Sequence, residues 1–511
     1  MKKTISMILA LAMMLCLLTS FACADDEYAE HMDFSATFQE FGTVKGTDAV
    51  YDYFCDKFNI DVEMIPVSGD SFDEKNTIMI NGGTMTDWMM TFLDYGAYCT
   101  YAEQGMLKPL PEDWETRWPN IANMVEKSGM AEAIKIDGVT YCIPKAIFCN
   151  YVDGVALVHH TLYYRADWAK ELGFEFGDTI TVSELLAYCK AAVEKDMAGN
   201  GQTIGLEAGI NTGKSYTIEA FMNMYNTQYG DFIKTENGYI WGPTMDSTLE
   251  GIKFIRECYQ SGAVDPDFYL RTDSDAGTVF AAGGAAALFS QGTVGDYELF
   301  LTNATSGGLE NAKEKISVAV LTDDEGVWHG KQADNYCWET VFSPSISDEK
   351  LERALDLMDY LATDEAQRVI NMGLKDIDWE ETDAGELKMI TEGDIKEKYS
   401  SIFFWWVSSI LPDEFSLVSP ARDAYVRERI NAMYATRSAS NSYTATDADY
   451  KFFNGEAKNA FSVNVDDEIM RLVVEANLTD EALEKEWANY IDTNEPLWRP
   501  VIDELNAAFV G

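Results

Sequence analysis

The chain has 511 residues, of which 86 are Asp or Glu and 38 are Lys or Arg, so its formal net charge is −48. A surface this acidic repels nucleic acid and anionic membranes, which excludes both as direct binding partners. The length is sufficient for two or three domains with large cores, and the apolar content is that of an ordinary globular protein.

The first 24 residues have the pattern of a secretory signal peptide. Lys2 and Lys3 form its basic start, residues 5–18 form its apolar centre, and Ala24 ends an Ala-x-Ala cleavage site. We therefore expect an exported protein, extracellular, periplasmic or at the cell surface, cleaved after Ala24. The alternative is a lipid on Cys23, which would anchor the protein to a membrane. No later run is long and apolar enough to span a bilayer.

The first half of the chain alternates strands and helices. Residues 34–38 and 60–64 have strand patterns, and residues 50–58 and 72–80 have helical patterns. Asp137-Gly138 then forms the two-residue turn of a predicted hairpin. This alternation predicts an α/β protein with a mostly parallel sheet and helices on both faces.

One loop in this half leads to candidate ligand contacts. Residues 82–86 precede a predicted strand at residues 89–92 and deliver Asp87 and Trp88 to it. In open α/β sheets, ligands bind beyond strand ends at loops of this kind. Core packing is the alternative role for Trp88.

A second α/β pattern begins near residue 163. Thr181 and Glu184 have the capping-box spacing that satisfies the free N–H groups at a helix start. Asn237-Gly238 marks another hairpin, residues 246–261 form another amphipathic helix, and the tail from residue 425 is mostly helical.

Five short motifs occur in order along the chain: MINGGTMTD at residues 79–87, QGMLKPL at 104–110, IDGVTYCIP at 136–144, YRADW at 164–168 and DMAGNGQTIGL at 196–206. Each motif is short, and their common order carries the comparison. Together they resemble the extracellular solute-binding proteins of ABC importers, family 1.

The resemblance implies a two-lobe periplasmic-binding-protein-like fold of type II, in which each lobe is a mostly parallel sheet flanked by helices. Lobe 1 would contain residues 25–157 and about 335–400, and lobe 2 about 158–334 and 401–511. Crossovers would join the lobes near residues 156–164, 324–338 and 400–411. The ligand would bind in the cleft between the lobes, and hinge closure would trap it.

The resemblance also implies a function. The chain would be the exported substrate-binding component of an ABC importer, capturing a mono- or oligosaccharide and delivering it to a membrane permease. We expect a monomer without catalytic activity. The alternatives are a secreted carbohydrate-active enzyme of the glycosidase kind and a cell-surface protein for glycan binding or adhesion.

Aromatic residues supply further candidate ligand contacts. The chain has 12 Trp, 26 Tyr and 26 Phe. A sugar cleft needs flat rings that stack on apolar sugar faces, next to side chains that hydrogen-bond the hydroxyl groups. Besides Asp87 and Trp88, loops rich in such residues supply Tyr95, Trp241, Asn335, Trp338, Trp405 and Trp406. For each ring, burial in the core is the alternative.

One loop has the spacing of a calcium site. Asp196, Asn200 and Glu207 occupy the first, fifth and twelfth positions of an EF-hand-like segment, but Ala198 stands where a third oxygen ligand is usual. Some relatives in the resembled family hold calcium at the matching loop. We expect a plain turn, with a structural calcium ion as the alternative, and no other cofactor.

Seven cysteines follow the signal peptide: Cys55, Cys99, Cys142, Cys149, Cys189, Cys258 and Cys337. Their number is odd, and their spacing is that of neither a metal site nor a disulfide scaffold. We expect buried free thiols. The four histidines form no metal motif, which agrees with a protein that is not an enzyme.

Overall fold

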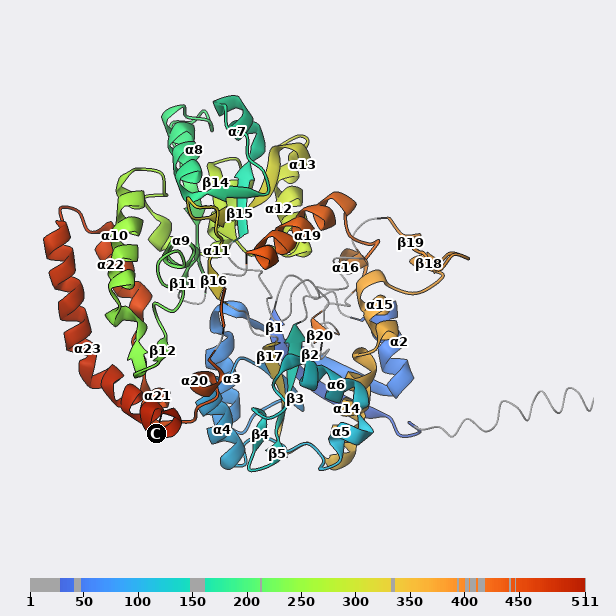
Figure 1. Ribbon diagram of the computed structural model, residues 1–511. Coiled ribbons are helices and arrows are strands. Elements are labelled where there is room, and N and C mark those ends of the chain that lie inside the picture. The colour runs from blue at the N-terminus through green and yellow to red at the C-terminus, as the bar shows by residue number, and fades with distance from the viewer. Residues whose placement is uncertain are drawn as a thin grey trace, which may run out of the picture.

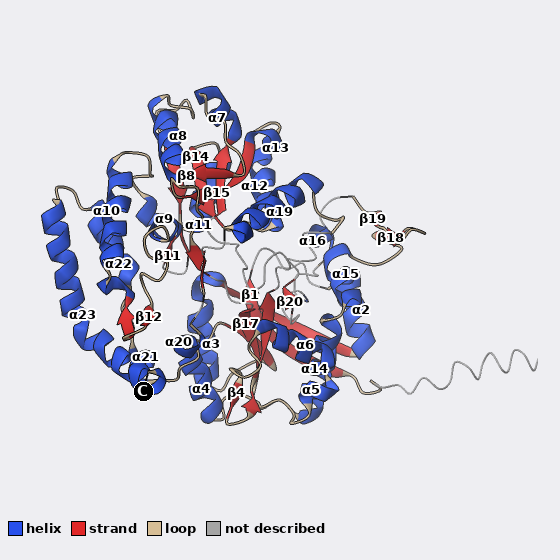
Figure 2. Ribbon diagram, in the orientation of Figure 1, coloured by secondary structure: helices blue, strands red, loops and turns tan. Residues whose placement is uncertain are grey.

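The computed structural model describes residues 28–40, 47–147, 161–211, 214–331, 336–392, 395–399, 404, 410–411, 419–440, 443–445 and 447–510. The predicted signal peptide lies outside these residues, so cleavage after Ala24 and lipid attachment to Cys23 remain predictions. The described chain forms two lobes, each built on one large sheet with helices around it (Figure 1, Figure 2). The predicted two-lobe α/β fold is confirmed.

The first lobe is built on a six-stranded sheet with the order β2-β1-β3-β17-β6-β20. Its strands are β1 (Met32–Glu40), β2 (Ile60–Ser68), β3 (Trp88–Thr91), β6 (Cys142–Ile147), β17 (Tyr336–Phe342) and β20 (Ile410–Leu411). All run in one direction except β17, which is antiparallel to both neighbours. Its main helices are α2 (Ala49–Phe58), α3 (Phe72–Asn81), α4 (Tyr95–Glu103), α6 (Pro119–Ser128), α14 (Asp348–Leu361) and α15 (Asp364–Met372).

The second lobe repeats this plan with a five-stranded sheet in the order β8-β15-β7-β14-β9. Its strands are β7 (Thr161–Arg165), β8 (Thr179–Thr181), β9 (Ile204–Ala208), β14 (Ala285–Ser290) and β15 (Ile316–Thr322). Here β7 is the antiparallel strand, so both sheets are mostly parallel. Its main helices are α7 (Ala166–Leu172), α8 (Val182–Glu194), α9 (Tyr216–Met222), α10 (Asp246–Gln260), α11 (Asp273–Ala281), α12 (Val294–Ser306) and α19 (Ala424–Ala439).

Local sequence signals fix several element ends. Thr181 caps α8, because its Oγ1 accepts from Glu184 N while Glu184 Oε2 accepts from Thr181 N at 2.9 Å. Asp137 and Gly138, with φ of 50° and 81°, form the tight turn between β4 (Lys135–Ile136) and β5 (Val139–Thr140). Both predictions are confirmed, and each depends only on neighbouring residues.

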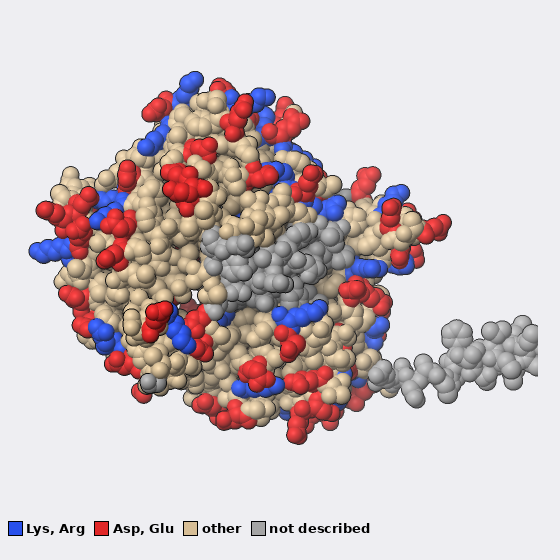
Figure 3. All heavy atoms as spheres, viewed as in Figure 1, with Lys and Arg blue, Asp and Glu red and all other residues tan. Residues whose placement is uncertain are grey.

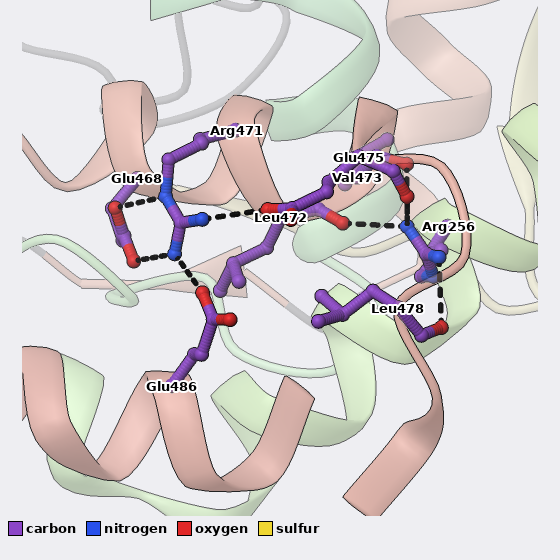
Figure 4. Close-up of polar contacts among 8 residues, drawn as sticks. All are labelled: Arg256, Glu468, Arg471, Leu472, Val473, Glu475, Leu478 and Glu486. Carbon is purple, nitrogen blue, oxygen red and sulfur yellow. Dashed lines mark hydrogen bonds and ion pairs between the residues drawn. The ribbon is translucent and has the colours of Figure 1, made fainter. Parts of the chain in front are cut away.

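Two C-terminal helices, α22 (Val465–Val474) and α23 (Asp480–Phe509), extend the second lobe. Arg256 on α10 donates to four backbone carbonyls at the end of α22 and in the loop after it, those of Leu472, Val473, Glu475 and Leu478 (Figure 4). Carbonyls at a helix end lack partners within the helix, and the guanidinium supplies them. Arg471 pairs with Glu486 and so joins α22 to α23.

The connections between the lobes follow the predicted order with one correction. β6 leads to β7, and β15 leads through β16 (Gly330–Lys331) to β17; β16 pairs with β21 (Tyr443–Thr444). The predicted boundary at residue 400 is too early, because β20 pairs with β6 in the first sheet. Phe404 also packs in the first core, with its ring centroid 4.4 Å from that of Phe54.

One segment assigned to lobe 2 contacts both lobes. It contains α20 (Ala448–Lys451) and α21 (Glu456–Ala460). The ring of Phe452 lies 5.6 Å from that of Tyr95 in the first lobe, and Phe453 lies 5.4 Å from Phe509 in the second. We call residues 447–461 the bridging segment.

The acidic side chains are spread over both lobes on the face shown in Figure 3, with fewer basic ones between them. Five predicted thiols, those of Cys55, Cys99, Cys142, Cys189 and Cys258, are buried and free, as predicted. Cys149 and the side chain of Cys337 lie outside what the structure describes. Within the described ranges, no helix combines the length and apolarity that crossing a bilayer requires.

Candidate functional site

The carboxyl ends of the parallel strands in the first lobe lie at the edge from which the chain crosses to the second lobe. β6 ends at this edge, and the chain continues to β7 of the second sheet. β3 runs in the same direction as β6 and ends there at Thr91. Ligands of open α/β sheets bind in the crevice beyond such ends. We call this edge of the first sheet, where its parallel strands end, the crossover edge.

A buried glutamate lies at the crossover edge. Glu339 on β17 is the register partner of Thr91 and is 9 % exposed. Its Oε1 accepts hydrogen bonds from Thr91 Oγ1 at 2.8 Å and from the backbone N–H of Leu93 at 2.6 Å. The pKa of Glu339 is raised to about 8: burial is the main cause, its two hydrogen bonds lower the pKa, and the carboxylates of Asp73 and Asp94 raise it. Both acids lie at helix starts, of α3 and α4.

Aromatic rings accompany this carboxyl group. Phe92 directly follows β3 and is 39 % exposed. Its ring centroid lies 5.9 Å from that of Trp338 and 5.7 Å from that of Phe72. The ammonium of Lys145 lies 4.8 Å from the Trp338 ring centroid. The crossover edge thus combines an accessible aromatic surface with a hydrogen-bonding carboxyl group, which is the combination that a sugar site needs.

The facing edge of the second lobe carries polar side chains. Ser290, the last residue of β14, pairs in register with Thr161 at the start of β7. Ser290 Oγ donates to Asp273 Oδ1 at 3.0 Å, and burial raises the pKa of Asp273. Arg437 on α19 donates to Thr161 Oγ1 at 3.4 Å, and burial lowers its pKa to about 10.

Of the predicted ligand contacts, Tyr95 and Trp338 lie at or beside the crossover edge. Trp338 precedes Glu339 on β17, and Tyr95 begins α4 after the end of β3. Burial raises the pKa of Tyr95 to about 12, and its ring packs on Phe452 of the bridging segment. Asn335, Trp405 and Trp406 lie outside the described residues and remain predictions.

Asp87 and Trp88 lie at the opposite, amino end of β3. Asp87 pairs with Lys350 at 2.9 Å and accepts from the backbone N–H of Ser35 at 2.8 Å. Trp88 is 1 % exposed, and its ring centroid lies 5.1 Å from that of Phe34. The loop before β3 therefore leads to the wrong end of the strand for a crevice at its carboxyl end. Neither residue's surroundings support ligand contact.

Trp241 is a core residue of the second lobe. It ends β13 (Gly238–Trp241), is fully buried and stacks on Trp498 of α23, with ring centroids 5.8 Å apart. The ring has no surface open to a ligand in this structure. Its burial follows from the packing of the β13 strand against α23, which spacing along the chain does not show.

The predicted calcium ligands have separate partners. Asp196 accepts from Gly201 N at 2.9 Å and from Thr203 Oγ1 at 2.8 Å, and the Thr203 bond is the main cause of its lowered pKa. Glu207 instead is fully buried in β9, with Arg271 Nε 3.2 Å from its Oε2. Asn200 Oδ1 accepts from the backbone N–H of Gln202 within the turn. Asp196 and Asn200 thus close a turn, and a calcium ion at this loop stays the alternative.

Other hollows and clusters lie away from the crossover edge. A cavity of about 650 Å³ between α2, α6 and α14 is lined by residues that include Lys57, Trp118 and Asp359. Among the described residues, one group approaches metal-ligand spacing, namely His31, Asp33 and Asp61, all exposed at the amino ends of β1 and β2. Neither contains a residue of the crossover edge.

Sequence reasoning missed Glu339 and Phe92. Glu339 directly follows the predicted contact Trp338. Because acidic residues are abundant in this chain, a single glutamate did not indicate a ligand contact. Phe92 was assigned to a strand, whereas β3 ends one residue earlier at Thr91. The signal that finds both is the pairing of β17 with β3, which joins residues 248 positions apart.

Solved structures of two-lobe solute-binding proteins have the same fold. The alginate-binding protein AlgQ2, without calcium ion, is 14 % identical with a TM-score of 0.65, and 94 % of this chain and 99 % of that one are covered. An HMO-binding, ABC-transporter-associated solute-binding protein from Bifidobacterium longum infantis is 13 % identical with a TM-score of 0.62, and 93 % of this chain and 97 % of that one are covered. FusA of S. pneumoniae in complex with kestose is 14 % identical with a TM-score of 0.60, and 94 % of this chain and 96 % of that one are covered.

A family model described as bacterial extracellular solute-binding protein matches residues 49–372, which is more than half of the chain. The chain therefore belongs to the bacterial extracellular solute-binding protein family. The comparison with curated proteins gives no match. The resemblance inferred from the five motifs is confirmed.

Proposed function

We propose that this protein is the exported substrate-binding component of an ABC importer and that it binds a mono- or oligosaccharide between its lobes. Hinge closure traps the ligand, and the closed protein delivers it to a membrane permease. Membership of the solute-binding family supports the transport role. Relatives named for alginate, HMO and kestose support a carbohydrate. The protein acts as a monomer and leaves the bonds of its ligand intact.

The observation that carries this proposal is the pairing of an exposed ring with a hydrogen-bonding carboxyl group at the crossover edge. Phe92 offers an apolar surface for a sugar face, and Glu339 offers an acceptor for hydroxyl groups. Tyr95 and Trp338 extend this surface. Asn335, Trp405 and Trp406 remain candidate contacts from the sequence.

A thermal-shift screen against mono- and oligosaccharides, with dipeptides as the competing class, tests the proposal. A ligand that binds only the folded state stabilises it by about 2.7 kcal/mol at a hundredfold excess over Kd. We expect at least one saccharide to raise the melting temperature, and calorimetry then gives its Kd. Stabilisation by dipeptides alone would overturn the carbohydrate assignment.

Two equally exposed aromatic residues provide a matched pair of variants. Phe92 and Tyr225 are both 39 % exposed, but Tyr225 lies beside Phe254 of α10 in the second lobe. Phe92→Ala is expected to weaken saccharide binding about tenfold, because a stacking surface is lost. Tyr225→Ala is expected to leave Kd unchanged. Equal effects of the two substitutions would remove the crossover edge from the site.

The bound saccharide also distinguishes the alternatives. Mass spectrometry after prolonged incubation should recover it unchanged, whereas a glycosidase would shorten it. A glycan-binding surface protein would bind polymer without lobe closure.

The same proposal predicts that the protein is exported and that it needs no metal ion for stability. We expect the secreted chain to begin at Asp25, and an intact mass with lipid on Cys23 would establish the anchored form instead. We also expect the chelator EDTA to leave the melting temperature unchanged. A fall that calcium reverses would instead assign an ion to the loop of Asp196 and Asn200.

A further inference from the structure

We propose that Glu339 selects the class of saccharide, by accepting hydrogen bonds from ligand hydroxyl or ammonium groups and by excluding acidic sugars. This inference rests on the proposed function, because it concerns the same crevice. It assigns an uncharged or amino saccharide as the ligand, whereas family membership and fold leave the charge of the ligand open.

The geometry of the carboxyl group is the first step. Both hydrogen bonds, from Thr91 Oγ1 and Leu93 N, go to Oε1 and fix the orientation of the group. Within the described part of the chain, no hydrogen bond to Oε2 is found. Glu339 is 9 % exposed and lies at the crossover edge, opposite Thr91 at the end of β3. One oxygen is therefore held by the protein while the other is available to a ligand.

The charges around the group are the second step. No Lys or Arg of the described residues forms an ion pair with Glu339. Asp73 at the start of α3 and Asp94 at the cap of α4 act on it as like charges. A uronate or sulfate placed here would add a negative group beside Asp73 and Asp94, and like charges brought together without water cost several kcal/mol. Hydroxyl and ammonium donors meet no such penalty.

Three described lysines lie near the crossover edge, but none of them pairs with Glu339. Lys145 on β6 is directed to the Trp338 ring, 4.8 Å from its centroid, whereas Pro144, the preceding residue of β6, is the register partner of Glu339. Lys458 of the bridging segment acts on Asp94, and burial lowers its pKa to about 8. The buried thiol of Cys142 on β6 is a further titratable neighbour of Glu339, and the ammonium of Lys451 lies over the ring of Tyr336 on β17, 4.3 Å from its centroid.

The wild-type protein supplies the first test, with maltotriose, chitotriose, chitosan trisaccharide and trigalacturonic acid as probes in thermal-shift and calorimetric titrations. We expect an uncharged or amino trisaccharide to bind at least about tenfold more tightly than trigalacturonic acid. Preference for the acidic probe would overturn the inference and leave the proposed function standing. Failure of all four probes would count against both.

Glu339→Gln supplies the second test, with Glu207→Gln as a control at the buried glutamate of the second lobe. The amide keeps the size of the side chain and an acceptor for Thr91 and Leu93, but places an NH₂ group where Oε2 was. Above about pH 8, where Glu339 is a carboxylate, we expect binding of the uncharged probe to weaken about tenfold, because hydrogen bonds to a carboxylate are the strong ones. The control should keep wild-type affinity. Equal Kd values for Glu339→Gln and wild type would overturn the inference.

The pH profile separates ligand contact from a structural role. Because the pKa of Glu339 is raised to about 8, its stronger-accepting carboxylate form appears as the pH passes through that value. Affinity for an uncharged probe should rise there in wild type and stay level in Glu339→Gln. Lys458 titrates in the same range, so the variant is the necessary reference. A rise that persists in Glu339→Gln belongs to another group and contradicts the role of Glu339.

Discussion

The two lobes place the same kinds of residue, a tryptophan and a glutamate, in different settings. In the second lobe, Trp241 and Glu207 are fully buried, Trp241 against Trp498 and Glu207 beside Arg271. In the first lobe, Trp338 and Glu339 are neighbours on β17 at the crossover edge.

Burial raises the pKa of both glutamates to about 8, so protonation does not distinguish them. Their partners distinguish them: the guanidinium of Arg271 lies 3.2 Å from Glu207, whereas Glu339 has no basic partner of this kind among the described residues. A residue is therefore a candidate ligand contact because it lies at a strand end and has an oxygen available to accept a hydrogen bond. Its residue type alone does not decide this.

The largest expected effect is a loss of stability when the buried tryptophan of the second lobe is replaced. Trp241→Ala should lower the free energy of unfolding by about 3–5 kcal/mol, because it empties the space of a large buried ring. Urea unfolding followed by circular dichroism measures this. Trp241→Phe should be milder and should bind saccharide as wild type does. Normal stability with lost binding in Trp241→Ala would place this ring in the ligand site.

Arg271→Ala should have the next largest effect. Arg271 lies 3.2 Å from Glu207 and 2.5 Å from Asp265, two carboxylates that are almost fully buried. Removing Arg271 takes away the cation that pairs with these buried acidic groups and costs about 3 kcal/mol of unfolding free energy. The control is Arg499→Ala, which breaks an exposed pair with Glu495 and should cost less than about 1 kcal/mol. Equal losses would contradict the structural role of the Glu207 cluster.

The raised pKa values predict a pH dependence of stability shared by both lobes. Between about pH 4.5 and about pH 8 the folded state keeps a proton on Glu207 that the unfolded chain releases. The contribution of this group to stability is therefore greatest at low pH and declines as the pH rises through that window.

Glu207→Gln and Glu339→Gln should each reduce this decline, measured as the difference in urea unfolding between about pH 5 and about pH 8. Only Glu339→Gln should also weaken saccharide binding. An unchanged pH dependence in both variants would contradict the raised pKa values.

The smallest expected effect concerns the contact between the lobes. Gly96 on α4 has no Cβ, and an added one would overlap the side chain of Asn459 in the bridging segment. Gly96→Ala should disturb this contact and change ligand affinity about fivefold by shifting the balance between open and closed forms. Asn459→Ala in the same chain should restore affinity, since it removes the overlap. No change in Gly96→Ala would show that the contact does not influence closure.

Much of the fold could be predicted because its signals are local. Thr181 with Glu184 and Asp137 with Gly138 determine a helix start and a hairpin turn through neighbouring residues. The alternation of strands and helices predicted two mostly parallel sheets. The boundary near residue 400 could not be placed, because it depends on two-residue β20 pairing with β6, far away in sequence.

The candidate site was less predictable for the same reason. Trp88, Trp241 and Trp338 are alike in sequence, and only tertiary packing shows which lies at the crossover edge. The direction of β3 decides that Asp87 is at its amino end and Phe92 at its carboxyl end. Glu339 gains its place from pairing with Thr91, which no spacing rule reveals.

Small-angle X-ray scattering of the wild-type protein, with and without the saccharide that stabilises it most, is the most direct measurement of the central claim. Two lobes joined by crossovers and closing on a ligand predict a smaller radius of gyration in the bound state. An unchanged radius at saturating saccharide would contradict closure, and the protein would then be a rigid glycan-binding module.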